Sequence, residues 1–332
     1  MLRPKLIAAL AGAALALTAC TATTPAPAPT PTSTASAEPT TLQLGLAGGD
    51  TDVRHDAAAA LAEQVSAATE GRVTLEITTG GEAASVEDGT LDLAVVDSAQ
   101  LTELNPDFGT FALPYAFDSA ETQARVLSDA AVVGDLYGSL ADSHHLTVLT
   151  GLYAGARNVA TNAHAVNTPA DLSGLRLAVT QSDTQVQVIE ALGAIAVPFA
   201  ADQIHAAIAA GTLQGVEDTQ FGYGAQNLAG TANFVSLTGH QLVPDYLVAN
   251  SDSLASLSDA DRQALLAALP AAATAANGAV ATAEQAGRTD AESKGVAYND
   301  VDKASFQAAT ESMVKAYLST PAREALYSAG QA

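Results

Sequence analysis

The stretch from Gly174 to Phe221 constrains the fold more than any other part of this chain, because two kinds of apolar spacing alternate along it. Every second residue is apolar where a strand is expected, and apolar residues recur three or four positions apart where a helix is expected. Ser182 is expected to cap the first helix, with Gln185 completing a capping box. The predicted order is a strand over 175–180, a helix over 182–192, a strand over 195–197, a helix from about 202 to 210 and a strand over 216–218.

This order of elements predicts a parallel sheet with right-handed crossovers. In such sheets, ligands bind beyond the carboxyl ends of the strands. Thr180 ends the first strand and Ser182 follows it, and Phe199 follows the second strand. Glu217 and Asp218 end the third strand. We therefore expect these residues to gather at one edge of the sheet and to include ligand-binding side chains.

The charge of the chain excludes one large class of partner. The 332 residues include 36 acidic and 13 basic side chains, which gives a formal net charge of -23. A surface this acidic repels phosphate backbones and anionic lipid, so we expect no nucleic-acid partner. The length is sufficient for two domains with ordinary cores, and we expect a monomer.

The N-terminus has the pattern of an export signal. Arg3 and Lys5 precede an apolar run over 6–17, which is too short to span a membrane. Leu17-Thr18-Ala19-Cys20 resembles the lipobox of bacterial lipoproteins, in which the cysteine becomes the lipidated first residue of the mature chain. An ordinary secretion signal with an incidental cysteine is the alternative. Cys20 is the only cysteine, so a disulfide within the chain is impossible.

The next segment is a spacer. Residues 21–40 consist almost entirely of Thr, Pro, Ala and Ser, and their prolines favour an extended tether. We therefore predict a signal peptide over 1–19, a lipid anchor and tether over 20–40, and a folded body from about 41. The lipid at Cys20 would hold that body outside the cytoplasm, at the cell membrane.

The body begins with a second unit of strand, helix and strand. Strands are predicted over 42–46, 72–78 and 91–96, and a helix over 56–69, with a polar turn over 80–89. Asp97 and Ser98 follow the third of these strands, so they too are expected at a carboxyl end. Tyr115 stands beside a proline and is a candidate for lining a cleft, whereas Phe117 is expected in the core.

The remaining elements are mostly helical. Helices are predicted over 119–140, 258–293 and 303–326, and strands over 146–149 and 237–248, the latter broken at Pro244. The helix over 258–293 would reach roughly 50 Å, which is longer than one small domain is wide. It is therefore expected to span two lobes.

No pattern in the chain predicts catalysis or a metal site. His144 and His145 are adjacent and would face different ways on a regular element, and no metal-binding spacing links the other histidines. No nucleophile elbow and no phosphate-binding loop is present. Glu217 and Asp218 point to opposite faces of their strand, so they cannot act as an acid/base pair. We expect no enzyme, no cofactor and no metal.

The body resembles the solute-binding proteins of tripartite ATP-independent periplasmic (TRAP) transporters over about residues 41 to 328. The resemblance is carried by GARNVATN (155–162), TPADLSGLRLAV (168–179), QSDTQVQVIEALGAIAVPF (181–199) and IAAGTLQGVED (208–218), with weaker support from FALPYAF (111–117) and ASLSDADRQALLAAL (255–269).

This resemblance implies an α/β, two-lobed fold of the periplasmic-binding-protein type, with a long helix across both lobes. The first lobe would comprise 41–155 and about 245–280, and the second 156–244 and about 281–332. The lobes would close over a small solute and deliver it to the membrane subunits of a permease. A ligand-sensing lipoprotein of the same fold is the alternative, and an enzyme outside the cytoplasm is a further one, which would release a changed product.

The resemblance also assigns roles to single residues, and here the chain departs from the family pattern. The arginine that clamps a ligand carboxylate falls at Ala178, and the amide near the end of the third strand falls at Asp218. A second family arginine matches Arg157, and an aromatic over the ligand matches Phe199. Alanine cannot replace a bidentate guanidinium. We therefore expect an atypical pocket in which Arg157 and Asp218 contact the ligand or pair with each other.

Overall fold

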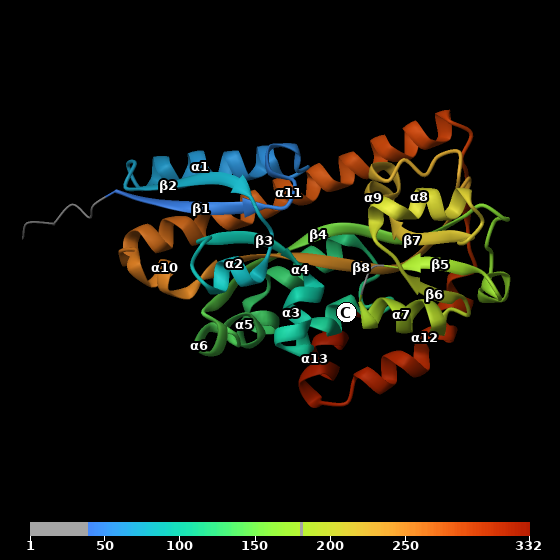
Figure 1. Cartoon of the computed structure of the whole chain (residues 1–332). Helices are drawn as coiled ribbons and strands as arrows, with labels where there is room; N and C mark the ends of the chain where they lie inside the picture. The colour runs from blue at the N-terminus through green and yellow to red at the C-terminus, as the bar shows by residue number, and fades with distance from the viewer. Residues whose placement is uncertain (1–38, 180–181) are drawn as a thin grey trace, which may run out of the picture. The chain divides into compact units, whose positions relative to one another are not determined.

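A computed structural model describes residues 39–179 and 182–332, and these residues form one body around a single mixed sheet (Figure 1). Within the described residues the sheet has nine strands in the order β2-β1-β3-β8-β4-β7-β5-β6, with β9 pairing beside β8. The strands are β1 Thr40–Leu46, β2 Val73–Thr79, β3 Leu93–Asp97, β4 Leu146–Thr161, β5 Arg176–Val179, β6 Ile195–Pro198, β7 Gly215–Thr219, β8 Phe234–Asn250 and β9 Ala297–Asp300.

The α-helices cover both faces of this sheet. They are α1 His55–Ala68, α2 Ala83–Glu87, α3 Ser98–Leu104, α4 Ala120–Ser128, α5 Ala130–Gly138, α6 Ala141–His144, α7 Asp183–Ala191, α8 Ala201–Ala209, α9 Gln220–Ala225, α10 Ser251–Ser256, α11 Asp259–Ser293, α12 Lys303–Tyr317 and α13 Pro321–Gly330. Short 3-10 helices are η1 Gly49–Thr51, η2 Pro106–Ala112 and η3 Pro169–Leu172.

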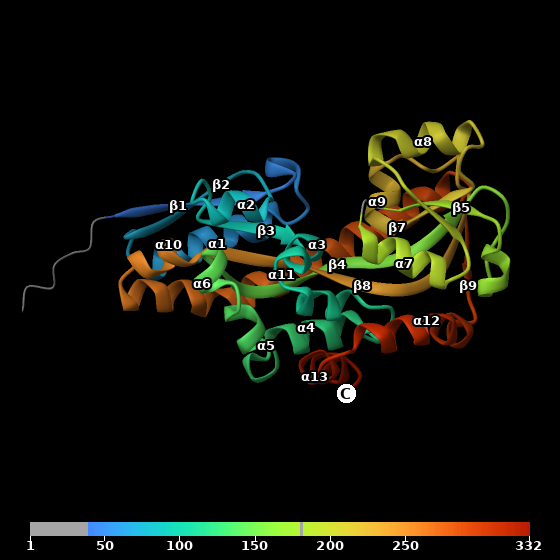
Figure 2. The same cartoon turned by 60° about the horizontal axis from the view of Figure 1, so that its bottom comes forward.

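The predicted parallel units are confirmed at both ends of the sheet. β1 pairs in parallel with β2 and β3, and β5 pairs in parallel with β6 and β7. Between these units, β8 and β4 run antiparallel to each other and to their outer neighbours β3 and β7. The two long strands therefore join the two parallel units, and the carboxyl ends of β3, β5 and β7 face the middle of the body (Figure 2).

The prediction that β8 breaks at Pro244 is wrong. β8 continues through Pro244, which lies opposite Tyr153 at the edge of a register shift in β4. β3 pairs with β8 only from Asp245, the residue after Pro244, onward. Because the regular ladder is interrupted on both sides of Pro244, the strand tolerates a residue that has no N–H to donate. A second correction is α2, which lies within the predicted polar turn.

Four apolar clusters fill the space between helices and sheet. α1 and α11 pack on one face of the β1–β3 unit, while α2 to α5 pack on the other face together with the second half of α13. In the β5–β7 unit, α8 and α9 cover one face, and α7 and α12 cover the other. Helix α12 therefore contributes to clusters at both ends of the sheet, through Phe306 and Val314, whereas α13 contributes to one. The division of the chain into lobes stays a prediction.

The long helix α11 has 35 residues and includes Pro270. Figures 1 and 2 show it running from beside α10 at one end of the body to α9 at the other. Among the described residues, it alone is long and apolar enough to cross a membrane by length and composition. Its buried side chains Leu265, Leu269 and Val280 pack against the rest of the body, as expected of a structural helix that braces both ends of the sheet.

Candidate functional site

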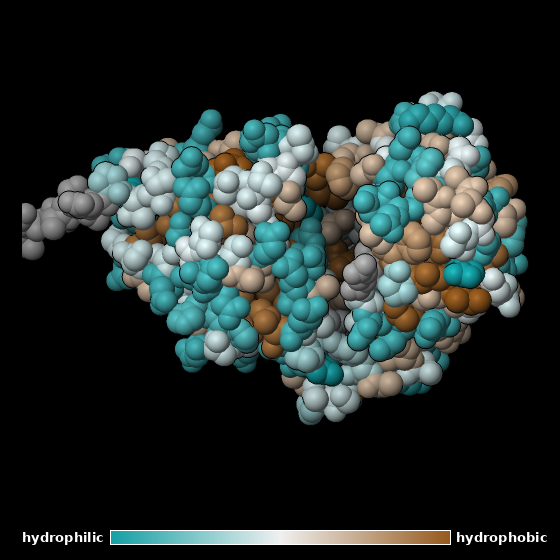
Figure 3. Space-filling model, in the orientation of Figure 1, coloured by the Kyte–Doolittle hydropathy of each residue, from teal (hydrophilic) through white to brown (hydrophobic). Residues whose placement is uncertain are grey.

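A cleft of about 750 Å³ lies at the carboxyl ends of β3, β5 and β7. Figure 3 shows the surface hollowed at this place, between the part that carries α3 and the part that carries α7 and α9. Its volume is typical of pockets that hold small molecules. The lining residues are Asp97, Ser98, Ala99, Thr102, Glu103, Gly109, Ala112, Ala154, Arg157, Ser182, Asp183, Thr184, Gln185, Asp218, Thr219, Phe221, Gly222, Val243 and Asp245.

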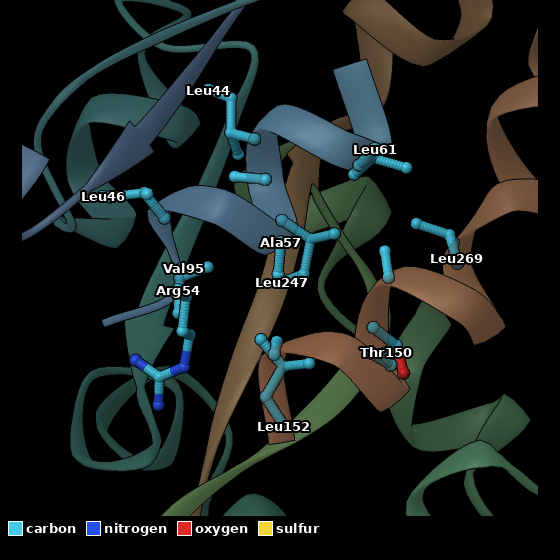
Figure 4. A pocket seen from close by; sticks show the side chains of 14 residues that line it. Leu44, Leu46, Arg54, Ala57, Leu61, Val95, Thr150, Leu152, Leu247 and Leu269 are labelled. Atoms are coloured by element: carbon cyan, nitrogen blue, oxygen red, sulfur yellow. The ribbon is translucent and has the colours of Figure 1, made fainter. Parts of the chain in front are cut away.

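A second cavity is much smaller and mainly apolar. It lies between α1, α11 and the sheet, has about 30 Å³, and is lined by leucines and alanines together with Arg54, Val95 and Thr150 (Figure 4). This space suffices for about one water molecule. The cleft at the carboxyl ends of β3, β5 and β7 is the candidate binding site, because ligands bind at such strand ends and charged and hydroxyl groups line it.

Arg157 of β4 is the one cationic side chain in the cleft lining given above. Its Nε and Nη2 each donate to a carboxylate oxygen of Glu217 at 2.7 Å, a bidentate geometry. Glu217 is 1% exposed and lies beneath the cleft floor. Burial opposes the charge on each partner, but the attraction between them outweighs it, so the pKa of Arg157 is raised and that of Glu217 is lowered. Only the Nη1 side of the guanidinium is left for other groups.

Asp218 lies on that remaining side, with its Oδ1 4.0 Å from Nη1 of Arg157. Its carboxylate also accepts hydrogen bonds from the Thr219 N–H at 2.7 Å and from the Gln226 side chain at 2.6 Å. Burial raises the pKa of Asp218. The two neighbours Glu217 and Asp218 thus both approach Arg157, although they leave the strand on opposite faces.

His240 stands behind Glu217 and was not singled out from the sequence. Its Nε2 lies 3.5 Å from a Glu217 oxygen, its Nδ1 lies 2.9 Å from the Thr238 hydroxyl, and its side chain is fully buried. No local pattern pointed to His240, because its neighbour Gln241 comes opposite Arg157 only through the pairing of β8 with β4. Long-range pairing of this kind cannot be read from one strand alone.

The opposite wall of the cleft is acidic. Asp97 ends β3 and pairs across the sheet with Asp245 of β8, so two carboxylates meet at this edge. Arg54 donates to Asp245 at 2.8 Å, and Figure 4 shows its guanidinium pointing away from the leucine-lined cavity. Burial raises the pKa of Asp245 to about 6. Asp97 accepts from the backbone and side chain of Gln100, and caps α3.

The capping box predicted for α7 is not formed. Ser182 is the N-cap residue, but its side chain makes no capping hydrogen bond. The side-chain oxygen of Gln185 is buried and has no hydrogen-bond partner. Both residues line the cleft instead, because the carboxyl end of β5 delivers the start of α7 to its edge.

Four residues that the sequence suggested for the site do not line the cleft. Glu217 lies beneath its floor, and the other three lie elsewhere. Ala178 is fully buried in the cluster that packs under α8 and α9, so its methyl group does not line the cleft. Phe199 packs against the same cluster, and Tyr115 packs near α7 and donates its hydroxyl to the Thr238 carbonyl. The aromatic residue in the lining is Phe221, whose spacing in the sequence gave no signal. Ser98 lines the cleft as expected, at 2% exposure.

Two predicted features lie outside the described residues. They are Thr180 and the N-terminal segment with Cys20 and the start of the tether. In the part of the chain that the structure describes, no group of three or more His, Cys, Asp or Glu side chains could hold a metal ion.

Comparison with known proteins identifies the family. The model of bacterial extracellular solute-binding protein, family 7 (DctP), matches residues 45–320. A solute-binding protein of Chromohalobacter salexigens is 29% identical over 255 residues, which cover 74% of this chain and 75% of that protein.

Solved structures agree with this match. A TRAP periplasmic solute-binding protein from Chromohalobacter salexigens with bound D-glucuronate superimposes with a TM-score of 0.78 at 26% identity, covering 87% of this chain and 99% of that one. One from Roseobacter denitrificans with bound β-D-glucuronate gives a TM-score of 0.76 at 26% identity, with the same coverage. The fold that the resemblance implied is thereby confirmed as that of the two-lobed periplasmic binding proteins. Because the family model spans most of the body and the solved relatives share its fold, this chain belongs to the DctP family of TRAP solute-binding proteins.

Proposed function

We propose that this protein captures a small polar solute in the cleft between α3 and α7 and delivers it to the membrane subunits of a TRAP permease. The single observation that carries the proposal is the cleft itself, which lies at the carboxyl ends of three strands and is lined by charged and hydroxyl groups. Two relatives at 26% identity hold D-glucuronate or β-D-glucuronate, which are solutes of suitable size.

The pocket is proposed to be atypical for the family. The position of the carboxylate-clamping arginine is occupied by Ala178, and Arg157 already binds Glu217 through two of its nitrogens. A ligand carboxylate could then meet only the Nη1 side of Arg157, next to Asp218. Zwitterions, amines, polyols and neutral polar solutes therefore fit better than a simple carboxylate, while a carboxylate held by Arg157 alone is the alternative.

Capture is proposed to be coupled to closure of the cleft. The two sides of the cleft are connected through β4, β8 and α11, so a hinge motion could bring the walls together without breaking the sheet. A solute that contacts both walls binds the closed form more tightly, and it shifts the population toward that form. The permease would recognise the closed shape.

The setting of this function is proposed to be the outer face of the cell membrane. The lipobox-like Leu17-Thr18-Ala19-Cys20 and the proline-rich segment that follows support a lipid anchor at Cys20 and a spacer. Metabolic labelling with a palmitate analogue tests this directly. Incorporation in the wild type and its loss in Cys20→Ala support the anchor, whereas equal labelling contradicts it.

A thermal-shift screen tests solute capture. The purified protein is heated with separate panels of carboxylates, zwitterions, amines and neutral sugars. A ligand that binds only the native state must raise the melting temperature. We expect a large rise in at least one panel, and the absence of any rise in all four contradicts the proposed function. Large rises with simple carboxylates alone would contradict the atypical pocket.

A further inference from the structure

The charges of the cleft are unbalanced within the described residues. Its lining carries five carboxylates, Asp97, Glu103, Asp183, Asp218 and Asp245, and one guanidinium, Arg157. That guanidinium already forms an ion pair with the buried Glu217, and Asp245 forms one with Arg54. Glu103 and Asp183 have no ion pair or hydrogen bond through their side chains in the described part of the chain. An anionic solute would therefore enter a field that repels it.

A second, independent observation lies on the other wall. Gln185 is 7% exposed and lines the cleft, and its side-chain oxygen has no hydrogen-bond partner. A buried acceptor left without a donor costs folding free energy, so natural proteins rarely keep one unless a ligand or water supplies the donor. The amide oxygen of Gln185 and the carboxylates of Glu103 and Asp183 are all hydrogen-bond acceptors. A solute group rich in N–H donors would satisfy all of them.

We infer that the solute carries an ammonium group, which binds in this cleft between the α3 wall with Asp97 and Glu103 and the Gln185 oxygen of α7. An ammonium is donor-only and can serve three acceptors at once. Residues of both α3 and α7 line the cleft, so a cation there draws on both walls. This inference rests on the proposed function, because it names the class of solute for the same site.

Calorimetric titration of the purified protein with four sugar-sized probes tests the inference. The probes are D-glucose, D-glucosamine, D-glucuronate and D-glucosaminate, which differ in whether they carry an ammonium, a carboxylate, both or neither. We expect binding of D-glucosamine or D-glucosaminate that is at least about tenfold tighter than binding of D-glucose and D-glucuronate. Tighter binding of D-glucuronate overturns the inference but leaves solute capture intact. Failure of both ammonium probes to bind also overturns it, whereas solute capture as such is judged by the broader thermal-shift screen.

Two variants locate the ammonium. Glu103→Gln should lower the affinity for the ammonium probe about tenfold. The control is Glu63→Gln, at an exposed position of α1 outside the cleft, which removes the same charge and should leave the affinity unchanged. Gln185→Leu should lower the affinity for the ammonium probe to a similar degree. It should also raise the melting temperature of the free protein, because it removes a buried oxygen that has no hydrogen-bond partner. A purely structural Gln185 would not produce opposite changes in binding and stability.

Gln187→Leu, on the exposed side of the same helix, is the control for Gln185→Leu. It should leave the affinity for the ammonium probe unchanged. Unchanged affinity in both Glu103→Gln and Gln185→Leu would overturn the placement of the ammonium between α3 and α7.

Discussion

Arg157 and Glu217 form the buried ion pair beneath the cleft, and it determines what Arg157 can offer a solute. Glu217 occupies the Nε and Nη2 edge of the guanidinium, while Asp218 and the cleft share the Nη1 side. His240 adjoins the far side of Glu217. The guanidinium is therefore held in one orientation before any solute arrives.

Removing the charge of Glu217 should destabilise the protein strongly. Glu217→Gln leaves the buried Arg157 without its carboxylate, which costs about 3 to 5 kcal/mol in the free energy of unfolding. Urea unfolding measures this loss. The matched control is Glu292→Gln, which removes a surface pair with Arg288 and should change stability little. Equal losses of stability in the two variants would show that the buried pair contributes no more to the free energy of unfolding than the surface pair.

Asp245 should make stability depend on pH. Its pKa is raised by burial to about 6 from its ordinary value of 3.8. Between these values the folded protein keeps a proton that the unfolded chain has released, so the contribution of Asp245 to stability is present at about pH 4 and is lost as the pH rises to about 6. The stability of the wild type relative to Asp245→Asn should therefore fall by about 2 kcal/mol over this range.

Urea unfolding of both proteins at several pH values measures this difference. Asp142→Asn, an exposed carboxylate on α6, is the control and should show a flat difference from the wild type. A flat difference for Asp245→Asn as well would mean that the carboxyl group titrates normally.

At the residue scale, the sequence predicted only part of the site. The resemblance to the family, and no local pattern, pointed to Arg157 together with Asp218, because the predicted strand over 146–149 ends before Arg157. The structure places their side chains 4.0 Å apart. The spacing of Gln185 from Ser182 fits a capping box, and the spacing alone does not distinguish a capping residue from one that lines the cleft. His240 and Asp245 come from β8, whose register against β3 and β4 depends on tertiary pairing that no local pattern encodes.

At the element scale, α11 holds β4 at the register shift between Tyr153 and Ala156. Asn277 accepts from the Tyr153 N–H at 2.8 Å, and Glu284 accepts from the Tyr153 hydroxyl at 2.7 Å and from the Ala156 N–H at 3.2 Å. Between these residues, Gly155 has a φ of +103°, and a Cβ there would lie 2.8 Å from Glu284. The helix thus fixes the strand at the point where the two sides of the cleft are joined.

Loss of this contact should weaken the protein. Glu284→Ala removes the acceptor for one hydroxyl and one buried N–H, which should lower the free energy of unfolding by about 1 to 3 kcal/mol. Gln285→Ala, at the neighbouring exposed position of the same helix, should be close to neutral. Differential scanning calorimetry of the two variants makes the comparison, and similar melting temperatures would argue against a bracing role for Glu284.

The elements themselves were largely predictable. Helix α7 and strand β7 follow clear periods, and α11 begins one residue after the predicted start, where the Ser258 side chain accepts from the Asp261 N–H. The failures have physical causes. Pro244 is tolerated because the ladder is interrupted on both sides of it, and α2 is only five residues long, too short for a helical period to show.

At the scale of the whole molecule, the long strands and α11 connect the two sides of a cleft that must close on its solute if the protein works by capture. Small-angle X-ray scattering of the protein, free and saturated with the probe that it binds most tightly, tests this central claim most directly. If solute contacts with both walls close the cleft, the saturated protein should have a smaller radius of gyration than the free protein. An unchanged radius, with binding confirmed by calorimetry in the same sample, would contradict it.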